Sequence, residues 1–381
     1  MFNKQDTSLL SNPLFESFFI GGFECSSHNL RHGRRLNLLR STQHYQFASK
    51  DFARLRSANI STIRTGANWH SIEVSPYQYE FAELRQYVSA VKKYGIQAIW
   101  DLCHYGYPND LDIFSTEFVD RFVAFARATA QVIIEETDTT LFICPINEIS
   151  FWAWAGGDAG YLNPFFNHRS FELKKQLVRA SLEAINAIRE ISPTVRVTAI
   201  DPIISIIPSH DDPEHVADAQ GHHNSQYQTW DMLCGWLCPE LGGNPTMLDI
   251  IGINYYNNNQ WIHGGSIIYD GEAGHRPFSA LARDVYERYR RPMFVAETGI
   301  EGDDRPTWLR YIANEVKHLL AENIPIEGIC LYPILDYPGW DDDRDCPSGL
   351  WSKANAFGER DVYAPLAEEL RTQQQLALLV S

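Results

Sequence analysis

The sequence lacks a long apolar run. Nowhere in its 381 residues do about 18 apolar residues follow one another, which is the length that a membrane-spanning helix requires. The first residues, MFNKQDTSLLSNPLFESFF, place Asp, Ser, Asn and Pro where a secretory signal needs a continuous apolar stretch. We therefore expect a cytoplasmic protein that neither crosses a membrane nor is secreted.

Basic residues are scarce. The chain has 32 Lys and Arg against 48 Asp and Glu, a formal net charge of −16 and a pI near 5.2. Nucleic acids and anionic membranes are polyanions that attract basic surfaces. The charge balance therefore predicts that neither is a partner.

Cysteine is present at only seven positions, an odd number scattered along the chain. This pattern is typical of reduced thiols in a cytoplasmic protein and not of a disulfide framework. Cys234 and Cys238 lie four residues apart, but no second Cys or His pair follows at the spacing of a zinc site. No cofactor and no metal is expected from these residues.

Two polar loops were also weighed as metal sites. Asp341, Asp343 and Asp345 have the spacing of a calcium loop, but Cys346 stands where that loop needs Gly and Ser352 where it needs Glu. A solvated or substrate-facing acidic loop over 341–345 is therefore the favoured interpretation. The His-rich stretch 210–223 is interpreted as a polar excursion, with a metal role as the less favoured alternative.

What the sequence does contain is a regular alternation of short apolar runs and longer amphipathic segments. Near-continuous hydrophobic runs are typical of strands buried on both faces. Eight such strands are predicted at 18–26, 60–69, 97–106, 141–149, 196–203, 249–257, 292–300 and 326–336. Helices are predicted at 49–59, 81–95, 116–136, 170–191, 277–290, 305–323 and 361–379, with Ser49 and Ser115 as N-caps of two of them.

This alternation predicts an α/β fold, a (β/α)8 TIM barrel. A doubly wound open sheet is the alternative, but no glycine-rich dinucleotide fingerprint follows the first strand. We expect one domain over 1–381, with the surplus over a typical barrel placed in extended loops at 27–48, 203–247 and 337–360.

The run FICPINEIS, residues 142–150, ends a buried strand on Asn147 and Glu148, although a buried charge is costly unless it is paired. In a barrel, chemistry gathers at the C-terminal ends of the strands. A second carboxylate, Glu297, ends the seventh strand. By contrast, the Asn-Glu pair at Asn314 and Glu315 falls inside a predicted helix.

Two carboxylates that face each other across a pocket are what cleavage of a glycosidic bond requires. A separation of about 5–5.5 Å would indicate retention, and a wider gap inversion. Arg64 and the hydroxyl of Tyr256 are candidates to hold Glu297 ionised. Glu148, beside neutral and aromatic neighbours, is the candidate for a raised pKa and hence for the proton donor.

These residues resemble the motifs of glycoside hydrolase family 1, the β-glucosidase family of retaining barrel glycosidases. The similar segments, in order, are RTGANWHSI (64–72), HYGYP (104–108), INEI (146–149), GINYY (252–256), AETG (296–299) and YPILDYPGW (332–340). The resemblance implies that Glu148 is the acid/base and Glu297 the nucleophile. It also implies that the sugar is surrounded by Arg64, His104, Asn147, Asn254 and Tyr256, with Asn147 contacting the 2-hydroxyl.

The sequence departs from the family at the sugar-binding positions. The family usually has a Gln at the end of the first strand, where this chain has Asn29. It usually has a Glu before the Trp of the last loop, where Gly339 precedes Trp340 and Asp341 follows. We place Asn29, Trp340 and Asp341 among the substrate contacts, and we expect a divergent member whose preference for glucose is not assured.

Three functions were weighed. The favoured one is a retaining β-glycosidase acting on a small glycoside or oligosaccharide, or a transglycosidase that uses the same intermediate. The second is a barrel that binds carbohydrate without turnover, against which the two Glu residues argue, since a pure binder needs neither. The third is another barrel chemistry, such as metal-assisted hydrolysis, for which the sequence offers no ligand cluster. Separately, Glu148 and Glu297 could be structural carboxylates paired with Arg64, which is the less favoured interpretation of the pair.

Overall fold

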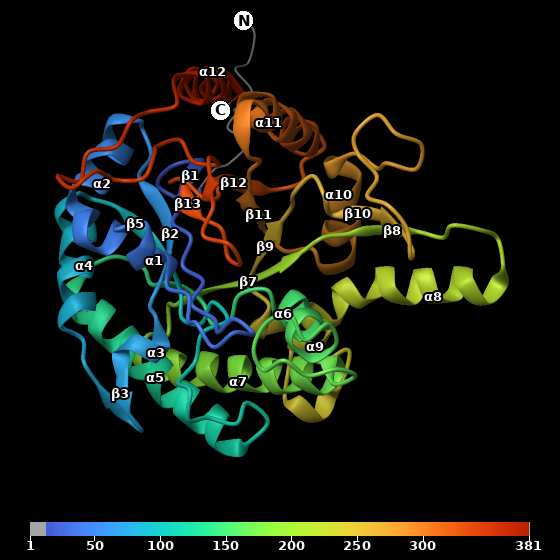
Figure 1. The fold of residues 1–381 in the computed structure, drawn as a ribbon, viewed down its shortest axis with the longest axis horizontal. Helices are drawn as coiled ribbons and strands as arrows, with labels where there is room; N and C mark the ends of the chain where they lie inside the picture. The colour runs from blue at the N-terminus through green and yellow to red at the C-terminus, as the bar shows by residue number, and fades with distance from the viewer. Residues whose placement is uncertain (1–12, 381) are drawn as a thin grey trace, which may run out of the picture.

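In the computed structural model, which describes residues 13–380, eight parallel strands close into a barrel (Figure 1). Each strand pairs with the next barrel strand along the chain, and the last pairs with the first. The strands are β1 (Phe19–Gly22), β2 (Thr62–Gly66), β5 (Gln97–Asp101), β6 (Phe142–Cys144), β7 (Arg196–Pro202), β9 (Ile250–Asn254), β11 (Met293–Thr298) and β12 (Ile326–Leu331). The predicted (β/α)8 barrel is confirmed.

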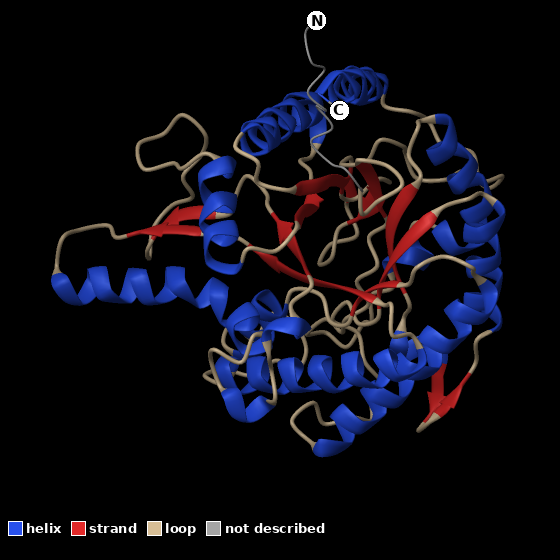
Figure 2. Cartoon of the chain, turned by 180° about the vertical axis from the view of Figure 1, so that it is seen from behind, coloured by secondary structure: helices blue, strands red, loops and turns tan. Residues whose placement is uncertain are grey.

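Helices surround the barrel (Figure 2). Those predicted from the sequence are α2 (His44–Ser57), α4 (Ala82–Lys93), α5 (Thr116–Glu136), α7 (Ser170–Ile191), α10 (Phe278–Tyr289), α11 (Arg305–Ala321) and α12 (Ala364–Val380). Further helices were not predicted: α1 (Leu38–Ser41), α3 (Trp69–Ile72), α6 (Ile149–Gly157), α8 (Pro213–Asn224) and α9 (Gln228–Leu233). None of the helices in the described part of the chain is long and apolar enough to cross a bilayer.

The two predicted N-caps had different outcomes. The Ser115 hydroxyl accepts a hydrogen bond from the Phe118 NH, as expected. The prediction for Ser49 was wrong, because α2 begins at His44 and Ser49 lies inside it. The turn before Ser49 starts at His44, whose buried ring forms a hydrogen bond with Asp51 at 2.8 Å. Phe47, later in the same turn, has a non-helical backbone conformation.

The loops carry most of the additional chain. The region after β7 contains β8 (Ser205–Ile207) and α8, and β8 pairs with β10 (Gln260–Ile262). Together they form an arm that projects from the barrel wall (Figure 1). Two further hairpins are β3 (Glu73–Ser75) with β4 (Gln78–Tyr79), and β13 (Tyr337–Pro338) with β14 (Asp345–Cys346).

The segment 1–12, on which the expectation of no signal peptide was partly based, lies outside the described residues. All seven cysteines fall within the described part and are unpaired, as predicted. The organisation of 1–381 as one domain stays a prediction.

The barrel interior has an apolar floor. Its buried side chains form a cluster of their own, separate from the larger core between strands and helices. Phe15, which precedes β1, packs against Phe142 at a ring-centroid distance of 5.5 Å and against Phe294 at 5.2 Å. Because both partners lie near the starts of their strands, Phe15 closes the N-terminal end of the barrel. The apolar plug at this end leaves the opposite, C-terminal end for the polar network described below.

Phe15→Ala should lower the free energy of unfolding by about 3–5 kcal/mol, because it removes a buried aromatic ring and leaves a cavity at the barrel floor. Urea denaturation followed by tryptophan fluorescence measures this change. The matched control is Phe357→Ala, whose side chain is 74% exposed and whose loss should stay within about 0.5 kcal/mol. Equal losses for the two variants would contradict the role given to Phe15.

Candidate active site

The C-terminal end of the barrel brings together side chains from five strands and the loops that follow them. Seven residues predicted from the sequence meet there in one hydrogen-bonded network that includes Tyr105: Arg64, His104, Asn147, Glu148, Asn254, Tyr256 and Glu297. All seven are buried except Tyr256, which is half-buried.

Arg64, on β2, is the centre of the network and is fully buried. Its Nη1 donates to Glu297 Oε1 at 2.7 Å, and its Nη2 donates to Asn147 Oδ1 at 2.6 Å. The other edge of the guanidinium forms a two-pronged pair with Asp101, at 3.1 and 2.7 Å. A buried charge needs partners of this kind, because removing it from water costs several kcal/mol. Arg64 therefore fixes three side chains from three other strands.

A β-bulge in β11 turns Glu297 toward the barrel axis. Ala296 belongs to the interior cluster, so strict alternation along the strand would point Glu297 outward. Val295 pairs with Ile253 and Glu297 with Asn254, so two steps along β11 match one step along β9. A bulge of this type re-aims the side chain beside it. This irregularity lets Glu297 reach Arg64.

Glu148 follows β6 and precedes α6, in a left-handed backbone conformation with φ 45° and ψ 57°. This conformation is strained for a residue other than glycine, and such strain clusters at functional sites. One carboxylate oxygen accepts a hydrogen bond from Asn254 Nδ2 at 2.7 Å, and the other accepts from the Tyr105 hydroxyl. Within the described residues, Glu148 has no Lys, Arg or His ion-pair partner.

Burial and the nearby charge of Glu297 raise the pKa of Glu148 to about 8, although its hydrogen bonds to Tyr105 and Asn254 oppose the shift. Glu297 lies in different surroundings: Arg64 holds one oxygen, and the Tyr256 hydroxyl donates to the other at 2.9 Å. The site therefore contains one carboxyl group that keeps its proton at neutral pH and one that is paired with a cation.

A continuous chain of hydrogen bonds joins the two glutamates. Tyr105, bonded to Glu148, also accepts a hydrogen bond from Asn147 Nδ2 at 3.2 Å. The side-chain oxygen of Asn147, Oδ1, accepts a hydrogen bond from Arg64, which also donates to Glu297. Asn147 therefore holds the two halves of the site in one fixed geometry.

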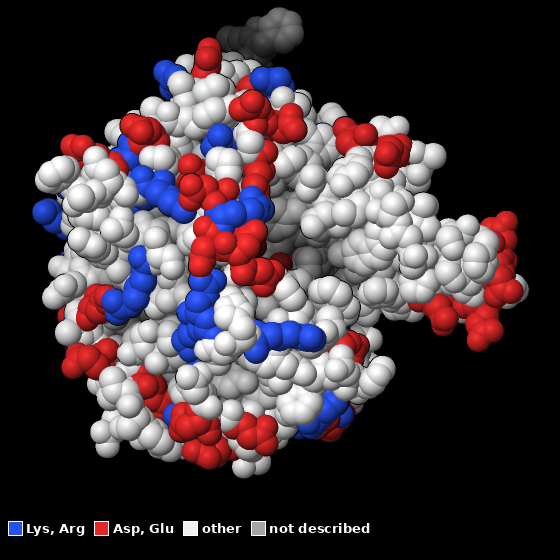
Figure 3. Space-filling view, in the orientation of Figure 1, with Lys and Arg blue, Asp and Glu red and all other residues white. Residues whose placement is uncertain are grey.

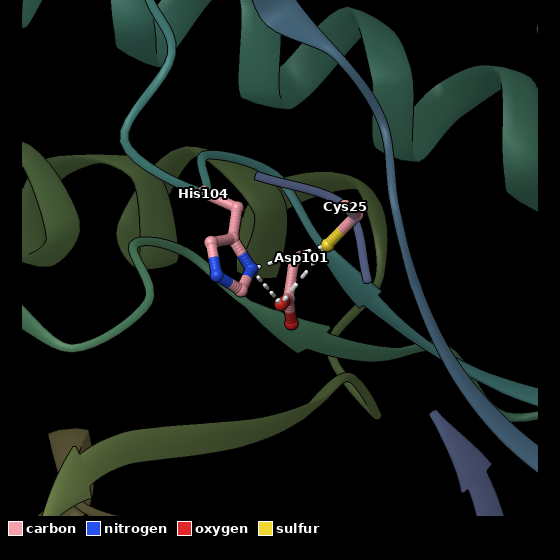
Figure 4. A group of neighbouring side chains, drawn as sticks. All are labelled: Cys25, Asp101 and His104. Carbon is pink, nitrogen blue, oxygen red and sulfur yellow. Dashed lines mark hydrogen bonds and ion pairs between the residues drawn. The ribbon is translucent and has the colours of Figure 1, made fainter. Parts of the chain in front are cut away.

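Cys25, Asp101 and His104 form a buried trio beside this chain, with their candidate ligand atoms within 4.8 Å of one another (Figure 4). His104 Nδ1 lies 3.1 Å from Asp101 Oδ2 and 3.1 Å from Cys25 Sγ. Asp101 Oδ2 already accepts a hydrogen bond from Arg64, and burial raises the pKa of the Cys25 thiol well above its usual value. These features suit a hydrogen-bonded trio that orients His104 and do not suit a metal site, since a divalent cation would compete with Arg64.

The Nε2 atom of His104 faces the centre of the site. It lies 3.0 Å from Asn147 Nδ2, which donates to it, and 3.9 Å from a carboxylate oxygen of Glu24. The predicted site included His104 but missed Asp101 and Glu24. Both lay inside predicted strands, at positions where a charge in an apolar run was a signal that could have found them.

Asn29, Trp340 and Asp341, the other predicted substrate contacts, lie outside the hydrogen-bonded network. The side-chain amide of Asn29 donates to Asn109 Oδ1 at 2.8 Å. Asp341 accepts from the Tyr161 hydroxyl at 2.7 Å. Trp340 lies closer to the site, and its ring contacts Tyr105 edge to face at 6.0 Å.

The acidic loop 341–345 is largely neutralised. Asp343 pairs with Arg34, and Asp345 pairs with Lys353. Figure 3 shows acidic and basic side chains interleaved on this face of the molecule, beside a hollow. The His-rich stretch 210–223 lies mainly on the projecting arm, where the rings of His210 and His215 stack at 4.0 Å. It lies apart from the network around Arg64.

Three tryptophans near the site, Trp69, Trp152 and Trp154, differ in their exposure. Trp69 and Trp152 are fully buried, and their indole NH groups donate to Glu73 and to the Asn163 carbonyl, respectively. Trp154 is about half exposed. The first two therefore belong to the core.

The chain shares its fold with solved β-glucosidases. It is similar to a β-glucosidase from Thermotoga maritima in complex with glucoimidazole, with a TM-score of 0.76 and 14% identity over 95% of this chain and 99% of that one. A β-glucosidase from Exiguobacterium marinum gives a TM-score of 0.75 and 15% identity over 94% and 98% of the two chains. The AHE enzyme from Alicyclobacillus herbarius gives 0.73 and 16% over 88% and 87%.

One of these similar structures is described as a family 1 β-glucosidase from Thermotoga maritima, with a TM-score of 0.74 and 14% identity over 95% of this chain and 98% of that one. No protein-family model matches the chain, and no curated protein matches its sequence. The resemblance to this family is therefore confirmed at the level of the fold.

Glu297→Gln should lower the pKa of Glu148 below about 8, because the charge of Glu297 is one of the causes that raise it. Infrared difference spectroscopy of the carboxyl band between pH 5 and 10 measures the titration. Glu287→Gln, at an exposed position of α10, is the control and should leave it unchanged. An unshifted titration in Glu297→Gln would show that the two carboxyl groups do not interact.

Proposed function

We propose that this chain is a retaining β-glycosidase that acts on a small glycoside or oligosaccharide. The observation that carries the proposal is the pair of buried carboxyl groups in unlike surroundings. Glu148 has hydrogen-bond partners but no cation, whereas Glu297 is bonded to Arg64 and Tyr256. Double displacement needs such a pair, because one group must donate a proton while the other attacks as a carboxylate. The fold shared with β-glucosidases supports the same proposal.

In the first step, Glu297 attacks the anomeric carbon and forms a glycosyl ester. The bond from that carbon to the leaving oxygen breaks, and Glu148 supplies the proton that the leaving oxygen takes up. The raised pKa of Glu148 keeps this proton available at neutral pH. Arg64 and Tyr256 orient the two oxygens of Glu297 for the attack.

In the second step, water attacks the anomeric carbon, the bond from that carbon to the Glu297 oxygen breaks and releases the carboxylate, and Glu148 takes a proton from the water. The ester has no negative charge, so its formation removes one cause of the raised pKa of Glu148. Glu148 therefore becomes a stronger acid after the first step and is able to act as a base in the second. A sugar hydroxyl in place of water would give transglycosylation from the same intermediate.

The remaining network residues surround the position of the sugar ring. His104, Asn147 and Asn254 offer polar atoms beside the two glutamates. The proposal gives Asn147 the contact to the 2-hydroxyl, which would strengthen as charge develops at the anomeric carbon. Trp340 and Asp341 would contribute from the rim.

Glu297→Ala should lower kcat on an aryl β-glycoside by at least about a thousandfold, because it removes the nucleophile. Added azide should restore part of the activity and give the opposite anomer. In the wild-type protein, a 2-fluoro glycoside should add its sugar mass to the peptide that contains Glu297, as measured by mass spectrometry. Glu287→Ala is the matched surface control and should keep wild-type rates.

The same experiment separates the competing functions. Sugar binding without turnover or labelling would indicate a carbohydrate-binding barrel. Loss of turnover on chelation, without a labelled Glu297, would indicate metal-assisted chemistry. A label on a carboxylate other than Glu297 would refute the role given to it.

Glu148→Ala should lower the rate strongly on glycosides with poor leaving groups and much less on those that need no proton. Azide should rescue this variant with retention of configuration. In the wild type, kcat/KM should fall as the pH rises through about 8, because Glu148 then loses the proton it must donate. A variant whose rate falls equally for good and poor leaving groups would show that Glu148 is not the acid.

A further inference from the structure

Glu24 is a third carboxyl group at the C-terminal end of the barrel, and the chemistry above does not use it. It follows β1 by two residues and is 8% exposed. Its neighbour Phe23 faces the helix layer, where its ring stacks on His44 at 3.5 Å. The chain stays extended past β1, where the Phe23 NH donates to the Arg64 carbonyl. Glu24 therefore points to the opposite side, toward the site, and its Oε1 lies 3.9 Å from His104 Nε2.

The polar contacts of Glu24 leave one oxygen free. Oε1 accepts a hydrogen bond from the Ser26 NH at 2.9 Å and lies 3.9 Å from His104 Nε2. Across residues 13–380, Oε2 has no hydrogen-bond partner, and neither oxygen has a Lys or Arg ion pair. Oε2 has no partner in the described part of the chain but is not fully enclosed by protein atoms. The carboxyl group therefore keeps an acceptor that reaches open space.

The surroundings of Glu24 place this acceptor near His104 and Glu297. Burial raises its pKa, His104 lowers it, and the charge of Glu297 raises it again. Charge interaction of this kind requires proximity. An acceptor that open space reaches is available to a hydroxyl group of a bound molecule.

Two neighbours in the same segment make Glu24 the best-placed acceptor there. Asn29 gives its side-chain amide to Asn109 and faces away from the network. The ring of His28 packs edge to face on Trp340 at 4.6 Å, but both its nitrogens are enclosed and without partners. Glu24 alone combines a free oxygen, exposure to open space and proximity to Glu297.

We propose that Glu24 determines the sugar specificity of this site by accepting a hydrogen bond from a hydroxyl group of the sugar cleaved between Glu148 and Glu297. This inference rests on the proposed function. A carboxylate there also repels a negatively charged sugar. The substrate class is therefore a neutral glycoside, and uronic acid glycosides and phosphorylated sugars are rejected.

The test uses Glu24→Gln and the monodeoxy derivatives of the best aryl β-glycoside. A hydrogen bond to a charged group contributes about 1.5–3 kcal/mol, so kcat/KM on the parent glycoside should fall roughly ten- to 150-fold. On the one deoxy derivative that lacks the recognised hydroxyl, wild type and Glu24→Gln should differ less than about threefold. The ratio of uronide to neutral glycoside turnover should rise in Glu24→Gln. Glu287→Gln is the control.

An equal loss on the parent and on every deoxy derivative would overturn the proposal, because it would show that Glu24 acts on the whole site through His104. No loss at all would overturn it as well. Labelling by the 2-fluoro glycoside keeps the two claims apart. A labelled wild type without deoxy selectivity refutes the role of Glu24 alone, whereas an unlabelled and inactive wild type refutes the proposed function and this role with it.

Discussion

The rest of the site depends on the buried guanidinium of Arg64. The Nε and Nη2 atoms of Arg64 pair with Asp101, and its Nη1 atom pairs with Glu297. Its single positive charge therefore meets two carboxylates, and no second Lys or Arg ion pair reaches either of them within residues 13–380. Any further carboxyl group at this end of the barrel enters a region that is already negative. Burial first, and the charge of Glu297 in addition, raise the pKa of both Glu148 and Glu24.

The barrel makes this concentration of charge tolerable by separating it from the apolar core. Phe15 and the aromatic residues around it fill the N-terminal end. Every charged side chain of the network therefore sits near the C-terminal end, where the strands give way to loops. Local backbone irregularities then orient the side chains. A bulge turns Glu297 inward, and Glu148 has a left-handed conformation where the chain passes from β6 to α6. The backbone strain is placed where the two carboxyl groups must meet.

The strands and the long helices were predictable because their signals are long and repeated. All eight barrel strands fall inside the predicted ranges, and α5 and α7 begin and end where the pattern predicted. Short elements had no such signal. The predicted strand 141–149 ends at Cys144, and α6 begins at Ile149. The sequence pattern missed this boundary because the left-handed conformation at Glu148 depends on tertiary contacts and no glycine marks it.

For the site, the sequence predicted seven residues that the fold brings together, from strand ends far apart in the chain. It missed Glu24, although a charge in an apolar run was a signal for it. The run alone could not show the inward direction of Glu24, which depends on Phe23 packing against the helix layer. Nor could it show that Asn29 is bound to Asn109. Such facts depend on how loops pack against each other, and a single strand pattern does not contain them.

The chemical part of this site and its recognition part are therefore separable. The residues around Arg64 form one closed network in which Asn147 and Tyr105 link the two glutamates. Asn29, after the first strand, and Asp341, in the last loop, lie outside it and bond Asn109 and Tyr161, respectively. Glu24 keeps one oxygen without a hydrogen-bond partner among the described residues. Changes in the second group leave the geometry of the first intact, because no hydrogen bond of the network passes through Glu24. Under the proposed function, a barrel with this division can change the sugar it accepts without losing the pair of carboxyl groups proposed to cleave it.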